Sequence, residues 1–403
     1  MSENNEIKEP LNKNNKVPKL RFKGFEEDWI LVNFYNHFTY FSTNSLSWDE
    51  LNYNSGDYLN LHYGIIHSIN SNLILSSSLP FINQDKLPKR FTLINEGDLI
   101  LADTSEDRKD AAKGIEIINQ SNAHILSGLH TIHLREKAPC TIPGFKTYYV
   151  ASKSFRNFTR KYCEGIKVFS IKPSLLKYTH FAYPQNKNEQ FMIVDFLNKI
   201  EDKKAILEKK IDILKKYKEG IEKYAYKFVE NQGSSIKFSD LFDNLIEKNN
   251  HKFQQYTIGK NGIKKIDEIN YDISNHKIFK KFNVIVGIGI DEIGINQDLE
   301  YGSVSPVYDV YNIRNLKYFD SIYVTLKEQL WKKRNFITRK STRREFEVDK
   351  YELKKMMLRV VDNKDFTNVY QSITNIKKVI EILNFSFNNL KTIKSYILRH
   401  MFI

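Results

Sequence analysis

One set of residues in this 403-residue chain has the composition of a metal-dependent nuclease site. Asp98 is followed by Asp107, Arg108 and Lys109, which imitates the carboxylates and lysine that hold Mg²⁺ beside a phosphodiester. The spacing is permissive, and no later part of the sequence repeats it. We therefore interpret Thr104 to Asp107 as a surface turn and expect no catalytic residue in this chain.

Cofactor motifs are also missing from the sequence. Gly287, Gly289 and Gly294 do not form a dinucleotide-binding loop, because Glu292 stands where the third glycine is required. The chain has no P-loop for a nucleoside triphosphate, and it lacks the Pro-Pro pair that adenine methyltransferase motifs usually contain. We therefore expect this chain itself to bind no cofactor.

The histidines and cysteines do not predict a metal site. His124, His130 and His133 lie close together, but their spacing matches no zinc motif. Cys140 and Cys163 are too few for a disulfide framework or a cysteine-based zinc site. We expect satisfied strand or loop histidines and no bound metal.

The strongest local signal is a cluster of basic residues near position 340. A similar but less dense basic segment lies near position 160. Both segments contain the tripeptide Arg-Asn-Phe, and basic side chains at a phosphate surface favour binding to nucleic acid. A solvated helix face would look the same, and the side chains that enter a groove cannot be read from sequence. The predicted DNA-binding residues are Lys153, Arg156, Asn157, Arg160, Lys161, Lys167, Lys332, Lys333, Arg334, Asn335, Arg339, Lys340, Arg343 and Arg344.

Two long segments with a heptad pattern must position these basic residues. Apolar residues alternate at steps of four and three from about 189 to 228 and again from about 365 to 402, with a constant offset of 176 between the two series. Helices of about 40 residues are about 60 Å long, so they most plausibly bury their seams against each other. The predicted seam residues are Ile193, Leu197, Ile200, Leu207, Ile211, Leu214, Ile221, Val369, Ile373, Ile376, Ile380, Leu383, Phe387, Leu390 and Ile397.

The segments that precede the two helices also resemble each other. Residues 145–151 resemble 319–325, and residues 156–161 resemble 334–340 with one insertion. Among the short β-like runs are 91–94, 99–102, 130–134, 147–150, 283–290 and 307–311; helices are expected near 152–160 and 324–334. The predicted fold class is mixed α/β: two similar α/β domains separated by two long helices that form an antiparallel coiled coil.

The predicted boundaries follow from this pattern. We expect a disordered tail at 1–16, a first recognition domain at 17–186, a first helix at 187–229, a second recognition domain at 230–363 and a second helix at 364–403.

Composition limits the class of protein. With 41% hydrophobic residues and a net charge of +14, the chain should be folded and basic, which favours a polyanionic partner. No apolar run approaches the roughly 18 residues needed to cross a bilayer, and the polar, acidic first ten residues do not form a secretory signal. We expect a cytoplasmic protein without a membrane partner.

Several motifs resemble one known family. Residues 17–29 (VPKLRFKGFEEDW) look like the opening of the specificity subunit of type I restriction-modification enzymes. Residues 97–107 (GDLILADTSED) and 302–308 (GSVSPVY) resemble the interior of its target-recognition domains. Asn188-Glu189-Gln190, which opens a heptad helix that ends near 214–220 (LKKYKEG), is similar to the family's first spacer helix. The second domain and the second helix lack the Pro-Lys-Leu-Arg-Phe and Glu-Gln openings, which leaves the start of the second domain uncertain.

The resemblance implies a non-catalytic subunit that recognises double-stranded DNA. Each domain would read one half of a bipartite site, and the helices would fix the spacer. Two methyltransferase subunits would bring S-adenosylmethionine, and restriction subunits would bring ATP-driven translocation and Mg²⁺-dependent cleavage. The alternatives from the residues alone are a self-contained DNA-binding or nuclease-like protein with a dimerising coiled coil, and a scaffold that binds only protein.

Overall fold

We analysed a computed structural model of the chain. The structure describes residues 17–69, 79–117, 123–248, 253–259, 262–267, 274–342 and 346–403. The predicted tail at 1–16 lies outside the described residues. Within the described part, no helix combines the length and the apolar character that crossing a membrane would require.

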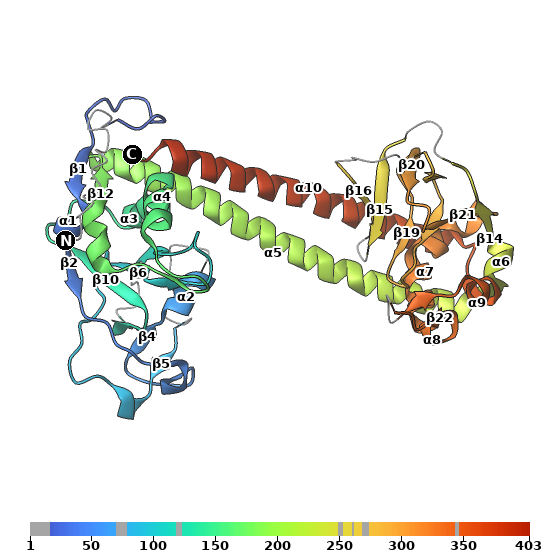
Figure 1. The fold of residues 1–403 in the computed structure, drawn as a ribbon, viewed down its shortest axis with the longest axis horizontal. Helices are drawn as coiled ribbons and strands as arrows, with labels where there is room; N and C mark the ends of the chain where they lie inside the picture. The colour runs from blue at the N-terminus through green and yellow to red at the C-terminus, as the bar shows by residue number, and fades with distance from the viewer. Residues whose placement is uncertain are drawn as a thin grey trace, which may run out of the picture. The chain divides into compact units, whose positions relative to one another are not determined.

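The chain divides into two compact units. Unit 1 contains Met1–Glu208 and Phe385–Ile403, and unit 2 contains Lys209–Asn384. Two long helices, α5 (Lys187–Gln232) and α10 (Lys364–His400), each contribute one part to unit 1 and the other part to unit 2 (Figure 1).

Unit 1 is a mixed α/β domain. Its larger sheet has the strand order β2-β10-β6-β8, and a smaller sheet has the order β3-β5-β4-β9. Strands β1 and β12 pair antiparallel beside them, with Ile30 opposite Tyr183. Its elements are β1 (Ile30–Asn33), α1 (Phe34–His37), β2 (Phe38–Phe41), β3 (Leu51–Asn52), β4 (Leu59–Leu61), α2 (Tyr63–Ser68), β5 (Phe81–Ile82), β6 (Leu99–Ala102), β7 (Thr104–Ser105), β8 (Gly114–Glu116), β9 (Ile125–Ser127), β10 (Thr131–Glu136), α3 (Phe145–Ala151), α4 (Lys153–Tyr162), β11 (Phe169–Ser170) and β12 (His180–Tyr183).

Unit 2 repeats the main sheet and the flanking strand pair of unit 1, whereas its other four-stranded sheet has the order β16-β15-β20-β17 and is connected differently from β3-β5-β4-β9. The sheet β14-β21-β18-β19 corresponds to β2-β10-β6-β8, and the pair β13-β24 corresponds to β1-β12. Its elements are β13 (Ser234–Lys237), α6 (Phe238–Leu241), β14 (Phe242–Leu245), β15 (Gln255–Gly259), β16 (Gly262–Lys265), β17 (Lys277–Lys280), β18 (Val284–Val286), β19 (Ile293–Ile295), β20 (Tyr301–Val304), β21 (Asp309–Ile313), α7 (Phe319–Lys332), α8 (Arg334–Ile337), β22 (Thr338–Arg339), β23 (Glu347–Val348), α9 (Lys350–Lys355) and β24 (Met357–Val360).

The same aromatic pair begins the core of each unit. Phe34 and Phe38 are buried in unit 1 with ring centroids 4.8 Å apart, and Phe238 and Phe242 are buried in unit 2 at 4.4 Å. In both units one ring lies on the four-residue helix and the other starts the next strand. The internal repetition seen in the sequence therefore reflects two copies of one fold.

The two long helices run in opposite directions. In unit 1, Glu201 near the start of α5 pairs with Lys394 near the end of α10 at 2.6 Å. In unit 2, Val229 near the end of α5 packs with Phe366 at the start of α10 in one apolar cluster. Every predicted seam residue is buried or half-buried. The mixed α/β fold class with two long antiparallel helices is confirmed.

The first long helix is anchored at its start by the N-terminal segment. The carboxylate of Glu189 accepts hydrogen bonds from Arg21 Nε at 2.7 Å and Nη2 at 2.8 Å, and from the Trp29 indole at 3.2 Å. Gln190 accepts from the Ile142 amide and donates to the carbonyl of Pro184. Residues of two family-like motifs, 17–29 and Asn188-Glu189-Gln190, therefore join the first domain to α5.

Three sequence predictions of local structure were wrong. Residues 147–150 lie in helix α3 rather than a strand, because the Glu116 carboxylate accepts the amides of Gly144 and Lys146 at the helix start. Residues 91–94 form no strand, although Leu93 makes an isolated bridge. Thr104 and Ser105 are buried in β7, which pairs with β11, so the exposed turn begins only at Glu106.

Candidate DNA interface

Helix α4 presents the predicted basic face of unit 1. Ser152 caps the helix by accepting the amide of Phe155, and Phe155 and Thr159 turn into the core one helical turn apart. The opposite face carries four exposed polar or basic residues, which are Lys153, Asn157, Arg160 and Lys161. Basic residues in the last turn also complement the helix dipole, so part of this charge serves the helix itself.

Two further predicted residues of unit 1 lie elsewhere. Arg156 is half-buried and donates from Nη1 to the carbonyl of Ala111 at 3.0 Å. Burial lowers its pKa to about 10, which still leaves the guanidinium charged at neutral pH. Lys167 is exposed in the loop between α4 and β11. Arg156 therefore ties α4 to the domain, whereas Lys167 lies at the surface.

In unit 2 the predicted basic cluster covers the end of α7, α8 and β22. Lys332 Nζ lies 3.8 Å from the ring centroid of Tyr226, and Lys333 donates to the carbonyl of Met357 at 2.6 Å. Arg334 stacks on Trp331 at 4.6 Å and donates to its carbonyl. These three cations are all engaged by groups of the protein.

The outer part of the same cluster is more exposed. Arg339 forms an ion pair with Glu347 at 3.3 Å, while Asn335 and Lys340 are exposed. Arg343 and Arg344 lie outside the described residues. In both Arg-Asn-Phe tripeptides the arginine donates to a backbone carbonyl and the asparagine is exposed. The acceptors differ, because Arg156 bonds to Ala111 in a distant segment and Arg334 bonds to Trp331 three residues before it.

A polar cavity in unit 1 adds residues that the sequence analysis missed. It has a volume of about 310 Å³, and the described residues that line it include two cations, Lys86 and Arg90, and no acidic residue. Its lining is Ser42, Thr43, Asn44, Ser45, Leu46, Lys86, Pro88, Arg90, Phe91, Thr92, Leu126 and Ser127. Hydroxyl and amide groups beside cations are the groups that contact phosphates and base edges in DNA complexes.

The inner wall of this cavity has unused hydrogen-bonding capacity. Ser127 is 3% exposed, and its hydroxyl has no hydrogen-bond partner within the described structure. Asn44 reaches the same region and donates to Asn60 at 2.7 Å. The sequence does contain a signal for this site, because residues 86–91 (KLPKRF) place three cations and an aromatic residue around a proline.

A larger groove in unit 2 is less suited to a polyanion. It has a volume of about 1020 Å³ and is bordered by α5, α7 and α10. Six lysines and six acidic residues line it, so its formal charge is close to zero. On charge, the small cavity of unit 1 is the better candidate for contact with DNA.

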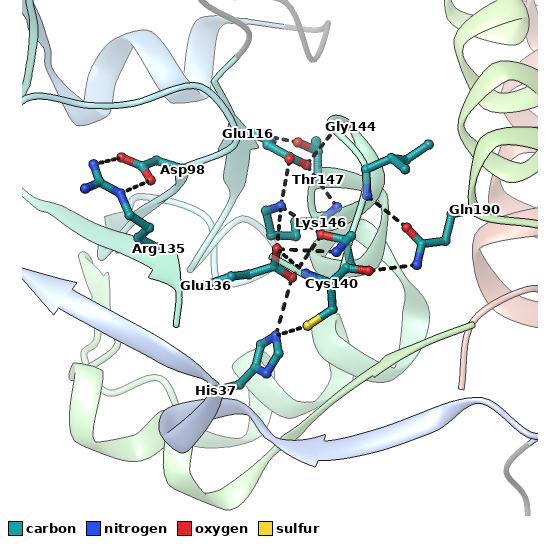
Figure 2. A network of polar contacts seen from close by, with 12 residues as sticks. His37, Asp98, Glu116, Arg135, Glu136, Cys140, Gly144, Lys146, Thr147 and Gln190 are labelled. Carbon is teal, nitrogen blue, oxygen red and sulfur yellow. Dashed lines mark hydrogen bonds and ion pairs between the residues drawn. The ribbon is translucent and has the colours of Figure 1, made fainter. Parts of the chain in front are cut away.

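The residues that imitate a nuclease have structural partners. Arg135 binds both oxygens of Asp98 at 2.7 Å, and His133 lies 2.7 Å from one of them (Figure 2 shows the arginine pair). Burial works to raise the pKa of Asp98, but the hydrogen bonds from Arg135 and His133 outweigh it and lower that pKa. Asp107 accepts the amide of Lys109 in an exposed turn. Asp98 is therefore committed to a buried ion pair.

Comparison with solved structures identifies the fold. The type I restriction-modification S subunit from M. genitalium aligns with a TM-score of 0.59 at 13% identity, covering 96% of this chain and 99% of that chain. The HsdS subunit from Thermoanaerobacter tengcongensis aligns with a TM-score of 0.42 at 14% identity, over 92% of this chain and 95% of that chain. A chain from work on the assembly and conformational transition of the type I R-M system gives 0.45 at 12% identity, over 92% and 96%. No family model and no curated protein matches the sequence.

The first of these alignments carries the conclusion about the fold. It includes nearly all of both chains, so the likeness of fold extends over both units and both long helices. The chain has the fold of a type I restriction-modification S subunit.

Proposed function

We propose that this chain is the DNA-recognition subunit of a type I restriction-modification complex. The observation that carries the proposal is the duplication of the main sheet and its flanking strand pair in two units, each of which is joined to both of two long antiparallel helices. Two similar readers suit a DNA site with two halves, and rigid helices suit a fixed gap between them. The resemblance of the sequence motifs to the same family supports this interpretation.

In this proposal the chain directs the complex to its DNA site and catalyses no reaction itself. Methyltransferase subunits would supply S-adenosylmethionine chemistry, and restriction subunits would supply ATP-driven translocation and Mg²⁺-dependent cleavage in the cytoplasm. The binding of Asp98 to Arg135 supports a non-catalytic role, since that carboxylate has its own cation. The polar cavity around Lys86 and Arg90, and the exposed face of α4, are the surfaces that we assign to DNA in the first half-site.

The helices also have apolar side chains on a second face, which supports docking of partner subunits. On α5, Ile206, Ile213, Tyr217 and Tyr224 are 55–61% exposed. They repeat at steps of seven, four and seven, which places them in one stripe about 110° around the helix from the seam. On α10, Ile382 and Phe385 are 64% and 68% exposed. An exposed heptad stripe is suited to adding a further helix, so we assign these faces to the methyltransferase subunits.

The proposal can be tested through the product of the complex. The chain would be co-expressed with its cognate adenine methyltransferase subunit, and N6-methyladenine would be mapped across the host genome by single-molecule sequencing. We expect one two-part motif with a fixed gap. Methylation without such a motif, or no methylation despite a stable complex, would contradict the proposal.

Variants make the assignment of half-sites specific. Replacing Lys86 and Arg90 by alanine should weaken methylation of every site and relax base preference in one half of the motif only. The matched control is a change of the exposed Lys19 and Lys23 to alanine, which removes the same charge away from the cavity. A nuclease-like protein would instead cut DNA with Mg²⁺ as the isolated chain, and a protein scaffold would show no salt-sensitive affinity for DNA.

A further inference from the structure

Three side chains of different chemical types converge at one end of unit 1. His37 ends helix α1, Glu136 ends strand β10, and Cys140 lies in the loop that follows this strand. Their ligand atoms, Nε2, a carboxylate oxygen and Sγ, all lie within 4.8 Å of one another (Figure 2). About 100 residues separate the histidine from the other two, so only the fold brings them together.

The spacing of these atoms fits a tetrahedral metal ion. His37 Nε2 lies 3.4 Å from Glu136 Oε1 and 3.9 Å from Cys140 Sγ. Ligands bound about 2.0–2.3 Å from a tetrahedral zinc ion lie about 3.3–3.7 Å from one another. The two distances from His37 Nε2 therefore lie within a few tenths of an ångström of the spacing that ligands of one ion require.

The carboxylate is already oriented for this role by its neighbours. Glu136 Oε2 accepts the amides of Cys140 and Thr141, and it lies 3.6 Å from Lys146 Nζ. These contacts leave Oε1 directed at His37, with the Thr141 hydroxyl at 3.0 Å as its other partner. Lys146 forms its closer ion pair with Glu116 at 2.8 Å, so its charge is largely balanced there. Such outer contacts fix the direction of metal ligands in proteins.

The site is largely shielded from water, and a buried carboxylate is stabilised by a bound cation. The side chains of His37 and Glu136 are 10% and 6% exposed. The imidazole packs against Phe181 and Tyr183, with ring centroids 5.2 Å and 5.8 Å away.

We propose that His37, Glu136 and Cys140 form a binding site for one zinc ion. A thiolate and an imidazole select zinc and cobalt over magnesium and calcium, and the carboxylate completes a set of three protein ligands with a water molecule in the fourth position. On binding, Cys140 loses its thiol proton to solvent, and the hydrogen bond between His37 and Glu136 is replaced by two bonds to the metal.

The ion would reinforce the connection between the domain and its long helix. The carbonyl of Cys140 accepts hydrogen bonds from Gln190 Nε2 at 3.0 Å and from Lys187, both in the first turn of α5. A zinc ion on Cys140 would therefore tie the start of α5 to strand β10 and helix α1. We assign the ion the role of holding these three segments together.

Cobalt substitution tests the site directly in the full-length chain. The protein would be stripped with a chelator and titrated with Co²⁺, and the thiolate-to-cobalt charge-transfer band and the visible d–d bands would be recorded. We expect one equivalent per chain, displacement by stoichiometric Zn²⁺ and no displacement by excess Mg²⁺. Native mass spectrometry with Zn²⁺ should give the same stoichiometry.

The only other cysteine of the chain provides a matched control. Cys140→Ser should abolish the charge-transfer band, and His37→Gln or Glu136→Gln should weaken affinity by about 100-fold or more, since even outer-shell changes cost about 10–100-fold. Cys163→Ser removes a buried thiol at the C-terminal end of α4, outside the ligand set, and should leave binding unchanged. Circular dichroism of each metal-free variant would establish that it is folded.

Two results would overturn the site. One is the absence of stoichiometric binding at micromolar Zn²⁺ by folded wild-type protein. The other is a charge-transfer band that survives in Cys140→Ser or disappears in Cys163→Ser. Neither result overturns the proposed DNA recognition, because the methylation motif is measured in a separate experiment that does not depend on detecting a metal.

Discussion

The buried ion pair between Arg21 and Glu189 gives the sharpest test of how the first domain holds its helix. The Glu189 side chain is 1% exposed and that of Arg21 is 10% exposed, and two hydrogen bonds of 2.7 Å and 2.8 Å join them. The pKa of Arg21 is raised, chiefly by its hydrogen bond to Glu189. Replacing Arg21 by methionine leaves a buried carboxylate whose one remaining side-chain donor, among the residues that the structure describes, is the Trp29 indole.

The cost of this change can be estimated from its burial. Removing one partner of a buried pair costs about 3–5 kcal/mol. We expect the lower end, about 3 kcal/mol, because the indole remains and the site is close enough to the surface for water to enter. For a unit of this size, that loss corresponds to a fall in Tm of about 6–12 °C.

Differential scanning calorimetry would measure the effect as the shift of the unit 1 transition. Lys19→Met is the matched control, because Lys19 is an exposed cation two residues away, and its shift should stay within about 0.5 kcal/mol. The double variant Arg21→Met/Glu189→Gln should recover much of the loss, since the buried charge is gone. The reasoning is refuted if Arg21→Met behaves like Lys19→Met, or if the double variant loses the sum of both single changes.

Three further predictions concern acid stability, DNA affinity and the helical spacer. The folded-state pKa of Asp98 is lowered, so the ionised Asp98 should stabilise the fold above the unfolded pKa of about 4, and this stabilisation should be lost as the pH falls through the lower folded value. Asp98→Asn should therefore flatten the pH dependence of the free energy of unfolding, measured with urea, in that window. Under the proposed function, replacing Lys86 and Arg90 by alanine should make the plot of log DNA-binding constant against log salt concentration less steep by about 1.8, at about 0.9 per lost phosphate contact. Fluorescence anisotropy on the cognate duplex would measure this slope. An unchanged slope would exclude the cavity from the interface. Inserting one heptad near Ala205 and another near Glu381 lengthens each helix by about 10 Å. The gap between the two halves of the methylated motif should widen by about three base pairs, with both half-sites unchanged. An unaltered gap in the methylome would show that the helices do not set the spacing.

Local periodicity is what the sequence by itself determined. The heptad seams and their constant offset predicted two long helices, because a helix turns each fourth or third side chain to the same face whatever surrounds it. The repeated segments predicted two similar domains, and the structure shows the same main sheet and flanking strand pair in both. Glu189 and Gln190 stood out in the sequence as part of a family-like motif, although their partners were not visible there.

Contacts between distant segments were decided only by the tertiary structure. Residues 147–150 have side chains that favour strands, yet they lie in helix α3. Glu116, at the end of β8, accepts backbone amides at the start of this helix. The cavity at Lys86 and Arg90 requires segments near 44 and 127 to close around a loop, and the candidate metal site requires His37 to meet Cys140. The free energy of such contacts depends on which side chains the whole fold brings together and buries, and neither residue spacing nor composition contains that information.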